Sequence, residues 1–193
     1  MKIIRNLMVI AAFAAVSATS AASWAMAGDD GQLFINANHR YSLRVPAGWM
    51  YPDRGSSGVF SRYGRDLQRI EIGRVKIKRA FRVIDVRGNA DMLPQELAEL
   101  FYANTVQARD LANAEIVSDE PTEIDGALGF RLDMRYSDGE GLTWREVHYG
   151  AVLRNRLITL SYVSPELHYF DEGLQPFEEL VASFDDDVRV RRR

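Results

Sequence analysis

Apolar and polar residues alternate along much of this chain, and the alternation predicts strands. In residues 41–45 every second residue is apolar, so one face of a strand would point to a core and the other away from it. The same pattern predicts further strands over residues 33–37, 130–136, 143–153 and 157–163. The last two are separated by only three polar residues, 154–156, which is typical of a hairpin.

Two stretches instead show the three- and four-residue spacing of a helix. The first begins at Pro94, whose missing N–H is no loss in a first helical turn, and is expected to end near Asn113. The second is expected to start at Ser164, Pro165 and Glu166, which together are typical of a helix start. Its apolar stripe consists of Leu174, Phe177, Leu180, Val181 and Phe184.

In residues 67–86 the alternation of apolar and polar residues does not keep a single phase. Ile70 and Ile72 would share one face of a strand, whereas Val75 and Ile77 fall out of phase with them. A bulge at Gly73 would restore the pattern, so we expect a long strand or a hairpin here.

These elements predict one α+β domain over residues 28–184, with an antiparallel sheet covered by two main helices. Trp49, which follows the turn at residues 46–48, is expected to close one end of the core. Residues 185–193 are mostly charged and are expected to form a flexible tail.

The N-terminus carries an export pattern. Lys2 and Arg5 precede a short apolar run at residues 7–16, and small residues lead to an A-x-A site that ends at Ala27. We therefore expect residues 1–27 to be a cleaved signal peptide and the mature protein to lie in the periplasm, or to be secreted beyond it. The alternative is an uncleaved anchor, although the strongly apolar part is shorter than the roughly 20 residues of a spanning helix.

Composition narrows the chemistry. The chain of 193 residues has no cysteine, which excludes a lipid-anchored lipoprotein, a thiol nucleophile and a thiolate metal site. Its formal net charge is −3, and removal of residues 1–27 would take away two further positive charges. Export and a mildly acidic balance both argue against nucleic acid as a partner.

Basic residues are concentrated between Arg62 and Arg87, where nine of them accompany three acids. Arg74, Lys76 and Lys78 alternate with apolar residues, so they would form a basic ladder on one strand face. One interpretation is a contact surface for an acidic protein, an anionic lipid headgroup or another envelope polyanion. The other is a solvated face that is partly neutralised by cross-strand neighbours. The residues considered for that neutralisation are Asp133, Arg135 and Glu146.

A metal site is the second candidate. Glu146 and His148 are two residues apart on a predicted strand and would share a face, and His168 or Asp171 would add a further ligand for zinc or manganese. The alternative is an ordinary polar strand face. No serine lies in a G-x-S-x-G elbow, so we expect neither a catalytic residue nor a cofactor, and a protein that is not an enzyme.

Three stretches resemble a known superfamily. Residues 41–49 resemble the opening strand and the VPxGW turn of PsbP-like proteins, residues 155–162 their penultimate strand, and residues 177–184 their closing helix. The resemblance extends over roughly residues 33–184. The superfamily also includes bacterial DcrB-like proteins. The resemblance implies a twisted antiparallel sheet flanked by helices, which is used mostly to bind other proteins, and it supplies no catalytic residue.

Together these observations lead to one hypothesis and two alternatives. The hypothesis is a non-enzymatic, exported binding or accessory protein of the bacterial cell envelope, which presents a sheet surface to an envelope protein or another envelope partner. The alternatives are a small metal-dependent enzyme that uses Glu146, His148 and His168, or a peripheral factor that makes a weak contact with an anionic membrane surface.

Overall fold

The computed structural model describes residues 23–53 and 58–187. Within them, ten strands, two α-helices and one 3₁₀ helix follow the chain in this order: β1 (Trp24–Met26), β2 (Gln32–Asn36), β3 (Tyr41–Val45), β4 (Met50–Pro52), β5 (Val59–Ser61), β6 (Arg69–Lys76), η1 (Ile77–Arg79), α1 (Pro94–Arg109), β7 (Ala112–Ile124), β8 (Ala127–Ser137), β9 (Thr143–Leu153), β10 (Arg156–Pro165) and α2 (Phe170–Ala182). None of the described helices is both long and apolar enough to cross a membrane.

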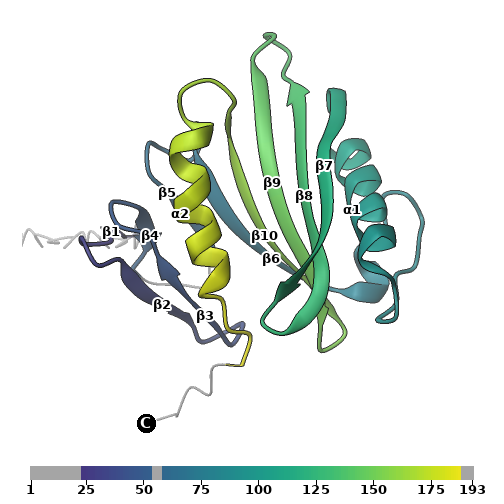
Figure 1. The fold of residues 1–193 in the computed structure, drawn as a ribbon, viewed down its shortest axis with the longest axis horizontal. Coiled ribbons are helices and arrows are strands. Elements are labelled where there is room, and N and C mark those ends of the chain that lie inside the picture. The colour runs from purple at the N-terminus through teal and green to yellow at the C-terminus, as the bar shows by residue number, and fades with distance from the viewer. Residues whose placement is uncertain (1–22, 54–57, 188–193) are drawn as a thin grey trace, which may run out of the picture.

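Eight strands form one antiparallel sheet in the order β1-β4-β5-β6-β10-β9-β8-β7, and β2 and β3 form a separate antiparallel hairpin (Figure 1). The long strands β7 to β10 follow one another as hairpins. The predicted α+β domain is confirmed.

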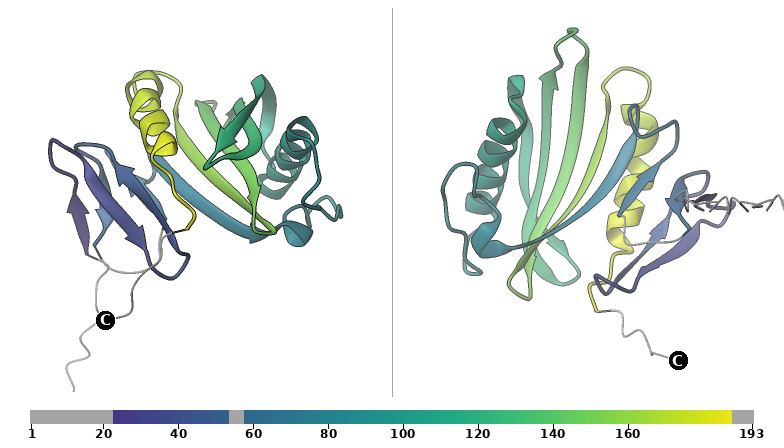
Figure 2. Two further views of the ribbon diagram at one scale, coloured as in Figure 1. Left: turned by 60° about the horizontal axis from the view of Figure 1, so that its bottom comes forward. Right: turned by 180° about the vertical axis from the view of Figure 1, so that it is seen from behind.

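The two helices cover opposite faces of the sheet (Figure 2). On β9 the side chains alternate between these faces, because neighbouring residues of a strand point in opposite directions. Tyr149 contacts Phe177 of α2 with ring centroids 5.7 Å apart, whereas His148 contacts Phe101 of α1 at 4.9 Å. Each helix therefore buries its own hydrophobic core against the sheet.

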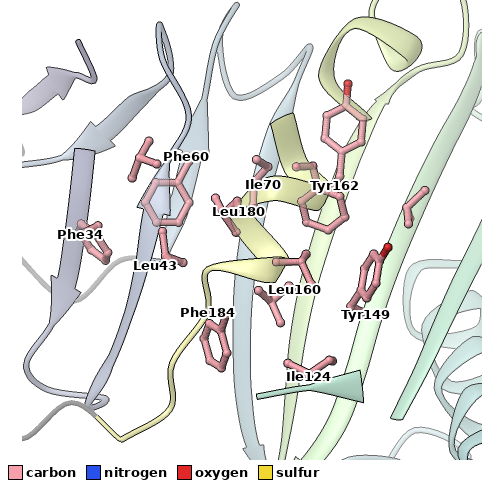
Figure 3. Packing of buried hydrophobic residues seen from close by; sticks show 14 of the residues in the cluster. Phe34, Leu43, Phe60, Ile70, Ile124, Tyr149, Leu160, Tyr162, Leu180 and Phe184 are labelled. Carbon is pink, nitrogen blue, oxygen red and sulfur yellow. The ribbon is translucent and has the colours of Figure 1, made fainter. Parts of the chain in front are cut away.

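The larger core lies under α2 and extends to the β2–β3 hairpin. Figure 3 shows Phe34 and Leu43 of the hairpin on one side and Leu160 and Tyr162 of β10 on the other, with α2 between them. Trp49 lies in this core with no exposed surface and packs edge-on against Tyr162, so its predicted position is confirmed.

The start of the charged tail is part of the domain, which corrects the prediction of flexibility for residues 185–187. Asp185 pairs with Ser42 of β3 through two backbone hydrogen bonds of 2.9 Å, and Asp186 is completely buried. Residues 185–187 are held in place because the chain runs along the β2–β3 hairpin directly after it leaves α2. The remaining residues of the predicted tail, 188–193, lie outside the described residues.

Within residues 67–86 the apolar residues change phase for a reason other than the expected bulge at Gly73. β6 pairs with β10 in an unbroken register, with Gly73 opposite Thr159, so there is no bulge at Gly73. The strand instead ends at Lys76, and Ile77 begins the 3₁₀ helix, from which its side chain is buried. Ile77 is out of phase with Ile70 because its side chain belongs to the core under α1, whereas Val75 is 37% exposed.

Gly73 provides a test of this register. A Cβ at residue 73 would meet Oγ1 of Thr159, so Gly73→Ala should lower the free energy of unfolding by about 1 kcal/mol, as mild overpacking does. In a Thr159→Ala background the same change should have no unfavourable effect, because the clash is gone. Urea denaturation of the four proteins measures both values, and an equal loss in both backgrounds would contradict the register.

The helix boundaries differ from the predicted ones in two places. α1 ends at Arg109 and not near Asn113, because Asp110 takes a left-handed conformation with φ of 51° and the chain turns into β7. α2 begins at Phe170 and not at Ser164, since Ser164 and Pro165 continue β10 and pair with β9. A proline is tolerated there because it is the last residue of the strand.

The predicted signal peptide lies mostly outside the described residues, which begin at Ser23. Trp24–Met26 form β1 and pair with β4, and the N–H of Ala27 donates to the carbonyl of Trp49 at 2.9 Å. Cleavage after Ala27 would therefore remove an edge strand and leave the main sheet of seven strands in place. The cleavage site remains a prediction.

Candidate functional site

The three residues of the predicted basic ladder do not form one exposed strand face. Arg74 points to the same side as Ile70 and Ile72, where its side chain is only 13% exposed. Its guanidinium forms an ion pair with Asp186 and donates to the carbonyl of His39 at 2.8 Å. Arg74 is therefore a structural residue, and its place in the ladder is corrected.

Lys76 and Lys78 are exposed, but they do not share a strand face, because β6 ends at Lys76 and Lys78 belongs to η1. Both line a cavity of about 810 Å³ at the end of β6, next to the turn between β9 and β10. This turn lies at the lower edge of the sheet in Figure 1. We call this cavity the basic pocket. Its seven cationic side chains are Lys76, Lys78, Arg79, Arg82, Arg87, Arg154 and Arg156.

Three separate segments carry these cations, and each is anchored by a buried apolar residue. Ile77 anchors η1, Phe81 anchors the turn that follows it, and Leu157 anchors the start of β10. All three belong to the core under α1, and all are at most 2% exposed. The N–H of Ile77 also donates to the carbonyl of Asn155 at 3.1 Å, which links η1 to the hairpin turn. The walls of the pocket are therefore held in place by the fold.

Most of the positive charge in the pocket is not compensated. Nη1 of Arg154 lies 3.3 Å from Oδ1 of Asp187, and its Nε lies 3.8 Å from Oδ2 of Asp186. None of the other six cations forms an ion pair with any carboxylate among the described residues. Every Asp and Glu of the chain lies in that described part. Of the described residues that line the pocket, Asp85 is the one acidic residue. A concave surface with this charge raises the local concentration of anions.

Asp133, Arg135 and Glu146 were expected to neutralise part of the basic ladder as its cross-strand neighbours. This prediction is wrong. Arg145 binds Asp133 with two hydrogen bonds of 2.9 Å, and Arg135 pairs with Glu115. Asp133 and Arg135 lie on β8 and Glu146 lies on β9, whereas the neighbours of β6 are β5 and β10. The acids named from the sequence are therefore not beside the basic segment.

The structure brings together two of the three predicted metal ligands. Glu146 and His148 share a face of β9, and His148 Nε2 lies 3.0 Å from Glu146 Oε2. His168 is exposed in the turn before α2, which covers the other face of the sheet. No group of three metal-ligating side chains is found among the described residues. The three-ligand site of Glu146, His148 and His168 is therefore wrong, because the fold places His168 elsewhere.

Glu146 is instead the centre of a buried polar network. The guanidinium of Arg109 donates to both of its carboxylate oxygens at 2.9 and 2.8 Å, and the hydroxyl of Tyr136 donates to Oε1 at 2.7 Å. Burial favours the neutral acid, but the hydrogen bonds from His148 and Arg109 outweigh it and hold the pKa of Glu146 well below its usual range. Glu146 is thus an ionised, fully paired carboxylate.

Ser161 completes this network, with its hydroxyl oxygen 2.7 Å from His148 Nδ1. Serine, histidine and glutamate in this order are also the components of a hydrolytic triad. Here, however, Ser161 lies in the middle of β10, where β6 and β9 pair with it on both sides. Its neighbouring backbone N–H groups serve the sheet, so they do not converge on the hydroxyl as an oxyanion hole requires. The arrangement suits structural support of α1 on the sheet.

Sequence reasoning identified Lys76 and Lys78 but missed Arg154 and Arg156. These two arginines flank Asn155, and their sequence was interpreted only as a polar hairpin connection. The signal that could have found them is the pairing of β6 with β10, which places Arg156 opposite Lys76. That pairing joins segments about 80 residues apart, and the local pattern does not contain it.

The fold and this site define a PsbP/Mog1-like α+β domain with a basic pocket at the end of its central strands. No family model and no curated protein matches the chain. Among solved structures, cyanobacterial PsbP (CyanoP) from Synechocystis sp. PCC 6803 is similar with a TM-score of 0.56 and 18% identity, over 89% of this chain and 97% of that one. A variant of the protein Mog1 is similar with a TM-score of 0.55 and 12% identity, over 80% of this chain and 95% of that one. The resemblance inferred from the sequence is thereby confirmed for the fold.

Proposed function

We propose that this chain is a non-enzymatic, exported binding protein of the bacterial cell envelope, and that it binds a negatively charged partner in the basic pocket. The observation that carries the proposal is the group of six cations that share one cavity and have no carboxylate partner within residues 23–53 and 58–187. Holding like charges together is unfavourable, so an anion that enters the pocket gains attraction and relieves repulsion.

Two features support the remaining parts of the proposal. The export pattern before residue 28 supports a place in the envelope, where anionic polymers and lipids are abundant. The buried polar side chains under α1 are bound to one another, which supports a structural and not a catalytic role for them. The basic pocket is then the accessible site that supports binding.

A photo-crosslinking experiment in the native envelope tests this function. Val83 is 45% exposed in the turn after η1, so a photoreactive residue there leaves all seven cations in place. We expect adducts whose yield falls at least tenfold when Arg79 and Arg82 are both changed to glutamate, because each reversal replaces attraction by repulsion.

Arg65→Glu is the matched control, since Arg65 is exposed and lies outside the pocket. It should leave the yield unchanged. Identical adducts in all three proteins at low salt would show that the pocket is not the binding site.

A further inference from the structure

We infer that the ligand of the basic pocket is a compound with several phosphate groups. This inference rests on the proposed function, because it names the chemistry of the anion that the pocket would bind. The argument depends on the donor and acceptor groups in the walls, on the amount of uncompensated charge, and on the geometry of arginine.

The walls of the pocket present almost only hydrogen-bond donors. All seven cations are donors without acceptor capacity, and the acceptors among the lining side chains are Asp85 and Asn155. A peptide would bring backbone N–H groups into the pocket, where few acceptors are available to pair with them. Phosphate groups offer acceptor oxygens and no donors when they are ionised. The pocket therefore matches phosphate better than an acidic peptide.

The lining offers little to an apolar ligand. Its apolar residues are Ile77, which is 1% exposed, and Val86, which is half-buried. Ordinary small-molecule pockets of similar size, roughly 300 to 1,000 Å³, are lined mainly by apolar and aromatic side chains. Recognition in this pocket is consequently ionic, and the bound part of the ligand consists of charged groups.

The charge of the pocket indicates more than one phosphate. The six unpaired cations together with Asp85 leave five uncompensated positive charges. A phosphate group carries about −1.5 to −2 at pH 7, so about three groups would neutralise the site. Five of the seven cations are arginines, and a planar guanidinium group can bind two oxygens of a phosphate.

Such phosphate groups have two sources in an envelope, a soluble oligophosphate compound or a phosphorylated headgroup of a lipid. Both present the same chemistry to the pocket. The experiment therefore uses one soluble probe and one membrane probe.

Isothermal titration calorimetry of the full chain tests the inference. Inorganic tripolyphosphate should bind at least tenfold tighter than citrate or a hexaglutamate peptide, because citrate and the peptide carry carboxylates in place of phosphates. Arg82→Ala and Arg156→Ala should each weaken tripolyphosphate binding at least tenfold, since each removes one guanidinium from a wall of the pocket. Arg65→Ala, which lies outside the pocket, should leave the affinity unchanged.

Sedimentation with phosphatidylcholine vesicles that contain a bisphosphorylated lipid identifies the source. Arginine-dependent sedimentation supports the inference with a lipid headgroup as ligand. Tripolyphosphate binding without sedimentation supports it with a soluble ligand.

The outcomes separate this inference from the proposed function. Equal affinity for tripolyphosphate, citrate and hexaglutamate, still dependent on Arg82, would overturn the phosphate inference and retain an anion-binding pocket. Tighter binding of hexaglutamate would overturn it in favour of an acidic protein segment. If no anion bound in a manner that depends on Arg82 or Arg156, both proposals would be wrong.

Discussion

Replacing Glu146 by glutamine should lower the free energy of unfolding by about 3 kcal/mol, which is the lower end of the range for breaking a buried ion pair. Glu146 has no exposed surface and accepts hydrogen bonds from Arg109, Tyr136 and His148. Glutamine keeps the shape but removes the charge, so Arg109 loses its buried counter-ion. The loss stays at the lower end because the Arg109 side chain is 34% exposed and retains contact with water.

The same substitution should change the dependence of stability on pH. The folded-state pKa of Glu146 lies well below its ordinary value of 4.5, so the ionised carboxylate stabilises the folded protein above that value. This contribution declines as the pH falls below 4.5 and is lost when the pH passes the folded-state pKa. Urea denaturation between pH 7 and pH 3 should therefore show a decline in the parent protein that is shallower in Glu146→Gln.

Glu115→Gln is the control for this prediction. Glu115 also pairs with an arginine, Arg135, but both side chains are about half exposed, so the pair is screened by water. Its removal should cause a much smaller loss of stability. Equal losses for Glu115→Gln and Glu146→Gln would contradict the central role of the buried network.

Replacing Asp186 by alanine should lower the free energy of unfolding by about 2–3 kcal/mol, mainly because Arg74 is left without its buried carboxylate. Burial raises the pKa of Asp186 although Arg74 and Arg154 act against it, so the ionised pair does not fully recover the cost of its burial. The double variant Arg74→Leu, Asp186→Ala should consequently be more stable than Asp186→Ala alone. Leucine suits residue 74 because it shares a face with Ile70 and Ile72.

Asp187→Ala is the matched control, because Asp187 follows directly in the chain but is 50% exposed. Its effect should be small in a thermal or urea melt. If Asp186→Ala were also without effect, the tail would not be held by the Arg74 pair, and the packed position of residues 185–187 would be contradicted.

Much of the fold could be predicted because the β8 to β10 region has a strong local pattern. Strands β8, β9 and β10 alternate in sequence as they do in the sheet, and short turns leave no choice but antiparallel pairing. β7 has a weaker strand signal, centred on Ile116 and Val117. It is an edge strand whose side chains are mostly exposed, so its thirteen residues show little apolar alternation.

The prediction was less accurate for segments whose local sequence pattern suits two different local structures. Ser164 and Pro165 are as suitable for a helix start as for the end of a strand, and pairing with Arg145 and Trp144 decides in favour of the strand. Likewise Gly73 suits a bulge in the sequence, but the register with Thr159 keeps the strand regular. In both cases the deciding interaction comes from a residue distant in the chain.

The sequence alone determined the class of fold, the core positions of its long strands, the concentration of positive charge before α1 and the expectation of export. These follow from periodicity and composition, which are local properties. Only the tertiary structure decided which charges are free. It buries Arg74 against Asp186, places Glu146 and His148 in a network away from His168, and brings Arg154 and Arg156 beside Lys76 and Lys78. The physical reason is that a charge is paired or unpaired according to its neighbours in space, and pairing of β6 with β10 chooses those neighbours.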